Sequence, residues 1–135
     1  MESKSYDCKN MERMQLTLIS IAETITNMIE WNKNIASVDD YYSSPAGMQL
    51  LAANCTLITA IGEGVNRINR LVPGFLSSNF PDIPWPDIIG MRNRIAHGYF
   101  ELDADIVLDA VKNGIPPLQD AILKAINRAK QARDC

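Results

Sequence analysis

The chain has a single histidine, His97, among its 135 residues. Its three cysteines, Cys8, Cys55 and Cys135, lie far apart and show no Cys-x-x-Cys spacing, which indicates reduced thiols rather than a disulfide framework. With one imidazole and scattered thiols, a zinc site within one chain is not expected, and a serine hydrolase would have only this ring as its base. We therefore expect no metal and no cofactor.

A long apolar run and an excess of positive charge are missing as well. The apolar segment from Leu16 to Ile25 is interrupted by Ser, Glu and Thr and is too short to cross a bilayer, and the N-terminal stretch is polar. These features predict a cytoplasmic protein without membrane contact. The formal net charge of -3 at pH 7 disfavours nucleic-acid binding through bulk charge, so any site for an anion must be local.

Apolar periodicity predicts an all-α fold. The length suits one domain over residues 1–135, 47% of the residues are hydrophobic, and no segment alternates with the period of two that is typical of strands. We expect an up-and-down helical bundle of three to four main helices plus a short extra helix. The main helices are expected over Met11 to Met28, Pro45 to about Arg70, Pro84 to about Gly98 and from Pro116 onward, and the short helix over Ala104 to Lys112, closed by Gly114. Residues 31–44 and 72–84 are rich in polar residues or helix breakers and are expected to be linkers.

The second predicted helix carries two glycines in its interior. Gly62 and Gly64 each lower helix propensity by about 1 kcal/mol relative to alanine, so we interpret them as points where another helix packs closely. The polar face of this helix includes Glu63 and Arg67, which lie at the spacing of an ion pair and are predicted to face solvent.

One residue contradicts the pattern of the helix that begins near Pro84. At 100° per residue, Trp85, Ile88 and Ile95 fall on one side of the helix, and Arg92 lies in the middle of that apolar stripe. Because burying an unpaired charge is costly, Arg92 must pair with a carboxylate, reach a cleft or face another subunit. A purely structural role, as a salt bridge or as a side chain that extends to water, fits the pattern equally well.

A second group of polar residues lies around His97, about 140° around the same helix from Arg92. His97 is expected in the last helical turn, above Asn93 and beside Arg94, while Gly90 leaves a bare patch of helix below it. Cations, a titratable ring and the phenol of Tyr99 suit a phosphodiester, and arginine is the usual choice for bidentate contact with phosphate.

Cleavage of RNA by its own 2′-OH needs a base, an acid for the leaving 5′-oxygen and a cation for the charge on the phosphorane. The acid and base roles are usually divided between two groups, and one chain supplies only one imidazole. A symmetric dimer would supply two rings, and an interface at Arg92 would also explain the arginine in the apolar stripe. The composition and the pattern together therefore favour a site shared by two chains.

The order of these residues resembles the signature of HEPN-domain proteins, in which an arginine followed by a polar residue precedes a histidine. Here the signature is formed by Arg92, Asn93, His97 and Tyr99. The longer segment PWPDIIGMRNRIAHGYFELD resembles the HepT branch, the toxins of HepT/MNT toxin–antitoxin systems, and the similarity covers nearly the whole chain. In one departure, Pro86 stands where relatives often carry a basic residue.

The resemblance implies an all-α homodimer in which two copies of the motif face each other across a cleft, and a metal-independent endoribonuclease activity on RNA. It places Arg92 and His97 at the catalytic positions and Asn93 at a supporting position, to which we add the neighbouring Arg94. Glu63 and Arg67 are weaker candidates for lining the same cleft.

The resemblance also implies a partner. Tyr99 takes the position of the tyrosine that the antitoxin, a minimal nucleotidyltransferase (MNT), modifies with AMP. Bulky anions beside the cleft would block RNA and repel its phosphates.

Two readings from other classes remain open on the sequence alone. The chain could be a catalytically silent HEPN module that binds nucleotides or a nucleotidyltransferase partner. It could also be a purely structural dimerisation bundle, in which Arg92→Leu would stabilise the fold and abolish nothing.

Overall fold

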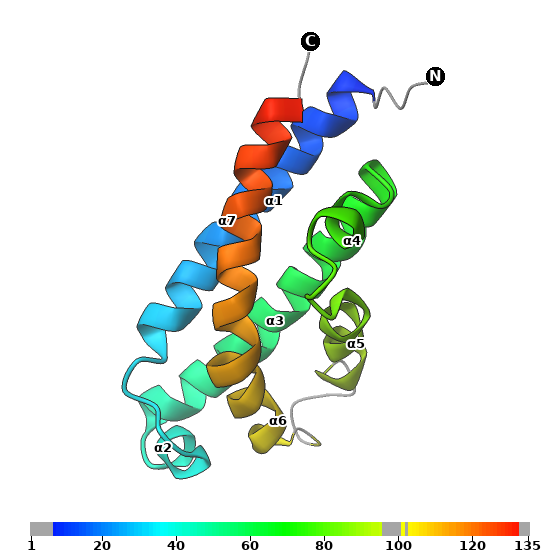
Figure 1. Cartoon of the computed structure of the whole chain (residues 1–135). Coiled ribbons are helices and arrows are strands. Elements are labelled where there is room, and N and C mark those ends of the chain that lie inside the picture. Colours follow the sequence, from blue (N-terminus) through cyan, green and yellow to red (C-terminus); the bar gives the residue numbers. More distant parts are fainter. Residues whose placement is uncertain (1–6, 96–100, 102, 133–135) are drawn as a thin grey trace.

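The computed structural model describes residues 7–95, 101 and 103–132, and these residues are helical or lie in short connections, with no strand among them. Four helices form an up-and-down bundle, because α1 and α5 run in one direction while α3 and α7 run in the other (Figure 1). This arrangement confirms the predicted all-α class. The four helices are α1 (Cys8–Trp31), α3 (Pro45–Leu71), α5 (Trp85–Ile95) and α7 (Ile115–Ala132).

The helix α3 is the central element of the bundle, since it packs against both α1 and α5. It begins as the sequence predicts: the hydroxyl oxygen of Ser44 accepts a hydrogen bond from the Gly47 backbone N–H at 3.0 Å, and Pro45 occupies the first turn. By length and composition this helix could cross a membrane, with a mean hydropathy of 1.2 in its most apolar window. The core helix of a water-soluble protein passes the same test, so this property of α3 does not contradict the expectation of a protein without membrane contact.

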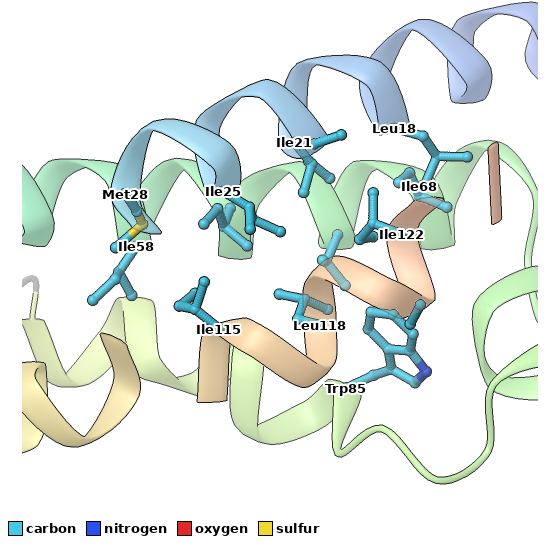
Figure 2. Close-up of a cluster of buried hydrophobic side chains, with 14 of the residues drawn as sticks. Leu18, Ile21, Ile25, Met28, Ile58, Ile68, Trp85, Ile115, Leu118 and Ile122 are labelled. Carbon is cyan, nitrogen blue, oxygen red and sulfur yellow. The ribbon is translucent and has the colours of Figure 1, made fainter. Parts of the chain in front are cut away.

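The apolar core lies between the long helices (Figure 2). The inward stripe of α1 predicted from its periodicity is buried, and so are all five residues predicted to face inward on α7. The helix α1 packs against both α3 and α7, while Trp85 adds to the same core from α5 and is only 4% exposed. Burial of this apolar surface is the main term that stabilises the fold. In α7 the five residues are Leu118, Ala121, Ile122, Ala125 and Ala129.

Both predicted linkers contain a short helix, which corrects the sequence-based expectation. The helix α2 (Val38–Tyr42) lies in the first linker and buries Tyr41 completely. The helix α4 (Phe75–Asn79) lies in the second linker and buries Phe75 and Leu76. Each helix has only five residues, so its stability comes from the burial of these side chains and not from periodicity or propensity.

A buried polar triad joins α1, α2 and α3. The side chains of Asn32, Tyr41 and Asn54 are at most 1% exposed. The Asn54 amide donates to the Asn32 Oδ1 atom at 2.8 Å and to the Tyr41 hydroxyl at 3.0 Å, and it accepts a bond from the Asn32 amide at 2.9 Å. The Lys112 ammonium group donates to the Asn32 carbonyl at 3.1 Å, which ties the same point to the C-terminal half of the chain. Buried polar groups need such partners, so the triad fixes where the end of α1 meets α3.

Acid is expected to weaken the attachment of α2. The Asp40 carboxylate accepts hydrogen bonds from the backbone N–H groups of Ala36 and Ser37, at 2.7 and 3.0 Å, and these bonds lower the pKa of Asp40. A pKa that is lower in the folded state adds stability above the unfolded value, and this stability is lost as the pH falls through the folded value. In urea titrations, wild type and Asp40→Asn should therefore differ at pH 7 and converge as the pH falls through the lowered pKa of Asp40. The control Asp39→Asn removes the same charge one residue earlier, and an equal effect of both changes would contradict this account.

The segment after Asp103 differs from its prediction at Gly114. As expected, the Asp103 carboxylate caps a short helix, α6 (Ala104–Asp109), by accepting from the Asp105 N–H at 2.9 Å. Gly114 does not end that helix. It belongs instead to a π-helical turn, η2 (Ala110–Gly114), that continues directly into α7. The sequence was misread because a glycine after a helical pattern usually marks a helix end, whereas a π turn has no comparable sequence signal.

The expectation of reduced thiols holds for Cys55 and is wrong for Cys8. Cys55 is free and half-buried in α3, and its burial raises the pKa of the thiol. Cys8, at the start of α1, is disulfide-bonded.

Candidate functional site

The helix α5 carries the polar cluster singled out in the sequence, and its start is held firmly. The Trp85 indole Nε1 atom donates to the Phe80 carbonyl at 2.9 Å. The backbone N–H groups of Asp87 and Ile88 both donate to the Pro84 carbonyl, and Asp87 lies in the first turn, where the helix dipole favours a carboxylate. Residues that follow on α5 are therefore placed by a fixed N-terminal anchor.

The helices α3 and α5 approach each other at Gly62. A Cβ atom at this position would lie 3.2 Å from the Ile88 carbonyl oxygen and 3.4 Å from the Cβ of Arg92. Gly64, on another side of α3, faces α1, where an added Cβ would lie 2.9 Å from a terminal carbon of Ile21. Both glycines therefore mark close helix packing, as predicted. Gly62 also brings the backbone at Arg92 close to α3.

The Arg92 side chain lies at the edge of this contact and is 35% exposed. Its Nη1 atom lies 4.0 Å from the Oε2 atom of Glu63 on α3, whose side chain is 61% exposed. Of the three possibilities predicted for Arg92, the pairing with a carboxylate is thus observed, and Glu63 is its partner. A partly exposed pair at this distance is worth at most about 1 kcal/mol. A phosphate can therefore compete with Glu63 for the guanidinium group.

Arg92 also lines a hollow of about 370 Å³ beside α3. The structure brings Glu63 and Arg67 to this hollow, so both weaker candidates from the sequence do lie next to Arg92. Two further residues, Asn66 and Arg70, line it as well. They belong to the same polar face of α3 as Glu63 and Arg67, which the sequence predicts to face solvent. Their spacing of three and seven residues from Glu63 was the signal that they share its side of α3.

The charge in this hollow is unbalanced. Three guanidinium groups, those of Arg67, Arg70 and Arg92, face one carboxylate, that of Glu63. In a chain with a net charge of -3, this is a local concentration of positive charge. Arginine forks bind phosphate oxygens with two parallel hydrogen bonds, so the hollow is suited to the backbone of a nucleic acid.

Asn93 and Arg94 point away from this hollow. Both side chains are exposed. Asn93 lines a second hollow together with Asn69 and Ser77, whereas Arg94 lines a third one, formed with α6 and α7. Gly90 lies between the second and third hollows, and a Cβ added there would meet nothing within 4 Å. The bare patch of helix predicted at Gly90 is therefore confirmed, but Asn93 and Arg94 do not share the hollow of Arg92.

The other two predicted site residues, His97 and Tyr99, lie outside the described residues. Their roles remain predictions from the sequence. Among residues 7–95, 101 and 103–132, no three His, Cys, Asp or Glu side chains gather in a group that could hold a metal ion.

The fold and the hollow at Arg92 define an all-α bundle with a cationic site on its central helix pair. Comparison with known proteins makes the class specific. Residues 21–125 match the family model described as "Ribonuclease HepT-like", and the chain belongs to this HepT-like family. The matched range includes α3, α5 and every described residue of the Arg92 hollow.

Named relatives give the same assignment. One is "Putative RNase MJ1380" of Methanocaldococcus jannaschii, 28% identical over 105 residues, which are 78% of this chain and 89% of the relative. Another is "Probable ribonuclease HepT" of Thermococcus cleftensis, 28% identical over 102 residues, with 76% and 86% of the two chains covered. A third is "Putative RNase TTE0752" of Caldanaerobacter subterraneus subsp. tengcongensis, 27% identical over 103 residues, with 76% and 85% covered. No solved structure matches the chain significantly.

Proposed function

We propose that the protein is a metal-independent endoribonuclease that acts as a homodimer. The observation that carries this proposal is the hollow in which Arg92, Arg67 and Arg70 face the single carboxylate of Glu63. Membership of the HepT-like family and the names of the relatives support a ribonuclease function. Single-stranded RNA is the substrate class that this geometry fits, because an open cationic hollow can take a flexible phosphate backbone.

In the proposed reaction, the ribose 2′-oxygen attacks the adjacent phosphorus while the bond from phosphorus to the 5′-oxygen breaks. A base takes the proton of the 2′-OH, and an acid gives a proton to the leaving 5′-oxygen. The products are a 2′,3′-cyclic phosphate and a 5′-hydroxyl. Arg92 binds the nonbridging phosphate oxygens, where negative charge develops. Its exchange of Glu63 for the phosphate requires only the loss of a weak, exposed ion pair.

His97 supplies the acid or base in this proposal. The sequence has one histidine, so two rings in one site require two chains. Asn93 and Arg94 are supporting residues on exposed faces of α5, where they can contact the RNA or the second copy. The composite cleft would place the two copies of α5 opposite each other.

We further propose that the protein is the toxin of a toxin–antitoxin pair, with a minimal nucleotidyltransferase (MNT) antitoxin as its partner. That partner would transfer AMP from ATP to the Tyr99 hydroxyl and release pyrophosphate. A phosphate on Tyr99 would add negative charge near a site that must bind RNA phosphates, and would therefore oppose substrate binding.

The alternative is a catalytically silent module that binds nucleotides or a nucleotidyltransferase partner. The third hollow, beside Arg94, is the observation that favours it, because apolar walls with a charged rim are typical of nucleotide sites. A structural dimerisation bundle is the remaining reading.

A cleavage assay in excess chelator tests the proposal. Wild-type protein and single-stranded RNA should give fragments that end in 2′,3′-cyclic phosphate and begin with 5′-hydroxyl, as read by mass spectrometry. Sedimentation at the assay concentration should give a dimer. If the RNA stayed intact, the result would favour the catalytically silent binding module. Full activity of a monomer would contradict a site shared by two chains. Mass spectrometry of Tyr99 after incubation with the partner and ATP tests the antitoxin proposal separately.

A further inference from the structure

The third hollow, beside Arg94, is an apolar pocket on the side of α5 that faces α6 and α7. It has a volume of about 460 Å³, which is in the range of ligand sites in proteins. Its apolar walls come from three helices, with Ile58 and Ile61 on α3, Ile88 and Met91 on α5, and Ile115 and Leu118 on α7. Figure 2 shows Ile58 and Ile115 toward one end of the core, with Leu118 further along α7.

The rim of the pocket is polar and carries charge of both signs. Asp87 and Arg94 line it from α5, and Asp109 lines it from the end of α6. One oxygen of the Asp109 carboxylate accepts a bond from the Asn113 amide at 2.7 Å, and the second oxygen can accept a bond from a ligand. The pocket therefore combines aliphatic walls with two acceptors and one cation.

Two glycines keep the pocket open. A Cβ at Gly90 or at Gly114 would meet nothing within 4 Å, and both residues line the pocket. Gly114 belongs to the π-helical turn η2, and such turns occur frequently at functional sites. Packing alone does not account for either glycine, in contrast to Gly62 and Gly64.

We propose that this pocket binds a nucleobase of an RNA strand whose backbone is held by the arginines of the separate Arg92 hollow, an inference that rests on the proposed ribonuclease function. Sequence-specific RNA recognition uses unstacked bases that enter pockets and are read along their edges. Arg94 at the rim would contact a phosphate. Two carboxylates at the same rim repel phosphate, so the base enters the pocket and the backbone stays outside.

The rim carboxylates select the kind of base. A carboxylate accepts hydrogen bonds and donates none, so it pairs well with the exocyclic amino groups of adenine, cytosine or guanine. Uracil offers a carboxylate only its N3–H, which lies between two carbonyl oxygens that repel the negative charge. Asp87 and Asp109 therefore favour an amino-bearing base over uracil. This preference would give an otherwise backbone-binding nuclease a base preference beside the cut.

The test uses binding alone, with AMP, UMP and a tetranucleotide whose 2′-hydroxyls are methylated to prevent cleavage. In methyl NMR spectra, the signals of Ile58, Ile88 and Ile115 should shift with AMP and with the adenine-containing tetranucleotide. The signal of Ile19, which lies on α1 away from the pocket, should not shift. UMP should bind about tenfold more weakly than AMP.

Variants at Gly114 and Asp109 test whether the nucleotide binds inside this pocket. Gly114→Leu fills the open space and should weaken AMP binding about tenfold or more. Gly114→Ala is the matched control and should bind as wild type does. Asp109→Asn should reduce the preference for AMP over UMP, because an amide can donate to uracil.

The outcomes separate this inference from the proposed function. Cleavage of RNA without shifts at the pocket methyls would overturn the base pocket only. Shifts without any cleavage would overturn the ribonuclease and leave a nucleotide-binding module. Shifts with AMP but none with the tetranucleotide would show a site for free nucleotides and would overturn the assignment to RNA.

Discussion

Arg92→Ala is expected to slow RNA cleavage by about two to three orders of magnitude, which is the usual effect of removing a group that stabilises charge in the transition state. His97→Ala is expected to have an effect of about the same size or larger, because it removes the proposed acid or base. Arg92→Lys should restore only part of the activity, since an ammonium group keeps the charge but cannot make two parallel bonds to phosphate. Initial rates on a labelled single-stranded RNA in excess chelator measure all three.

Two controls make this result interpretable. Arg13→Ala removes an exposed arginine from α1 and should leave the rate unchanged. Glu63→Gln removes the charge that competes for Arg92, so it should lower the KM and not slow cleavage. Thermal unfolding should show all of these variants folded. Wild-type rates in both Arg92→Ala and His97→Ala would contradict the catalytic proposal. A more stable Arg92→Leu variant with full function would favour the structural dimerisation bundle.

Asn54→Leu is expected to lower the free energy of unfolding by about 3 to 5 kcal/mol, a large part of the stability of a small domain. The substitution removes the three hydrogen bonds that Asn54 makes with Asn32 and Tyr41. The Asn32 amide keeps its bond to the Met28 carbonyl, and the Tyr41 hydroxyl keeps its bond to the Asn32 Oδ1 atom. Each lost buried hydrogen bond costs about 1 kcal/mol, and a buried group left with too few partners costs more. Urea unfolding with an unchanged slope measures the difference.

Two matched variants separate this network from hydrophobic packing. Tyr41→Phe removes one hydroxyl but leaves the paired amides of Asn32 and Asn54, so it should cost only about 1 kcal/mol. Thr56→Leu puts the same apolar side chain on an exposed position of α3 and should change stability little. If Asn54→Leu proved neutral, the triad would not determine how α1 meets α3.

The long helices could be predicted from the sequence because each buries a stripe with a regular period. The starts at Ser44 and Asp103 were predictable too, since their capping side chains act within one turn. The helices α2 and α4 were not predictable, because they depend on pockets for Tyr41 and Phe75 that exist only in the folded bundle. Short helices in polar or glycine-containing segments carry too few residues to show a period.

The unusual position of Arg92 could be predicted from the sequence, but its contacts could not. Arg92 could be recognised because it interrupts an apolar stripe, which is a local signal. Its partner Glu63 could not be assigned, since Glu63 and Arg67 show an ion-pair spacing of their own and the pairing with Arg92 depends on how α3 and α5 cross. The separation of Arg94 from the Arg92 hollow likewise follows from the neighbours of α5, which helical periodicity does not reveal.

The close contact at Gly62 has a consequence for finding other proteins of this kind. An arginine and a histidine at the motif spacing occur by chance in many helices, so the spacing alone identifies little. The contact at Gly62 adds a requirement at a distant point of the chain, because a larger residue there would push α5 away and move the arginine from the carboxylate it pairs with. A search pattern that also demands a small residue at the crossing point of the preceding long helix, followed directly by an acidic one, would therefore reject most chance matches.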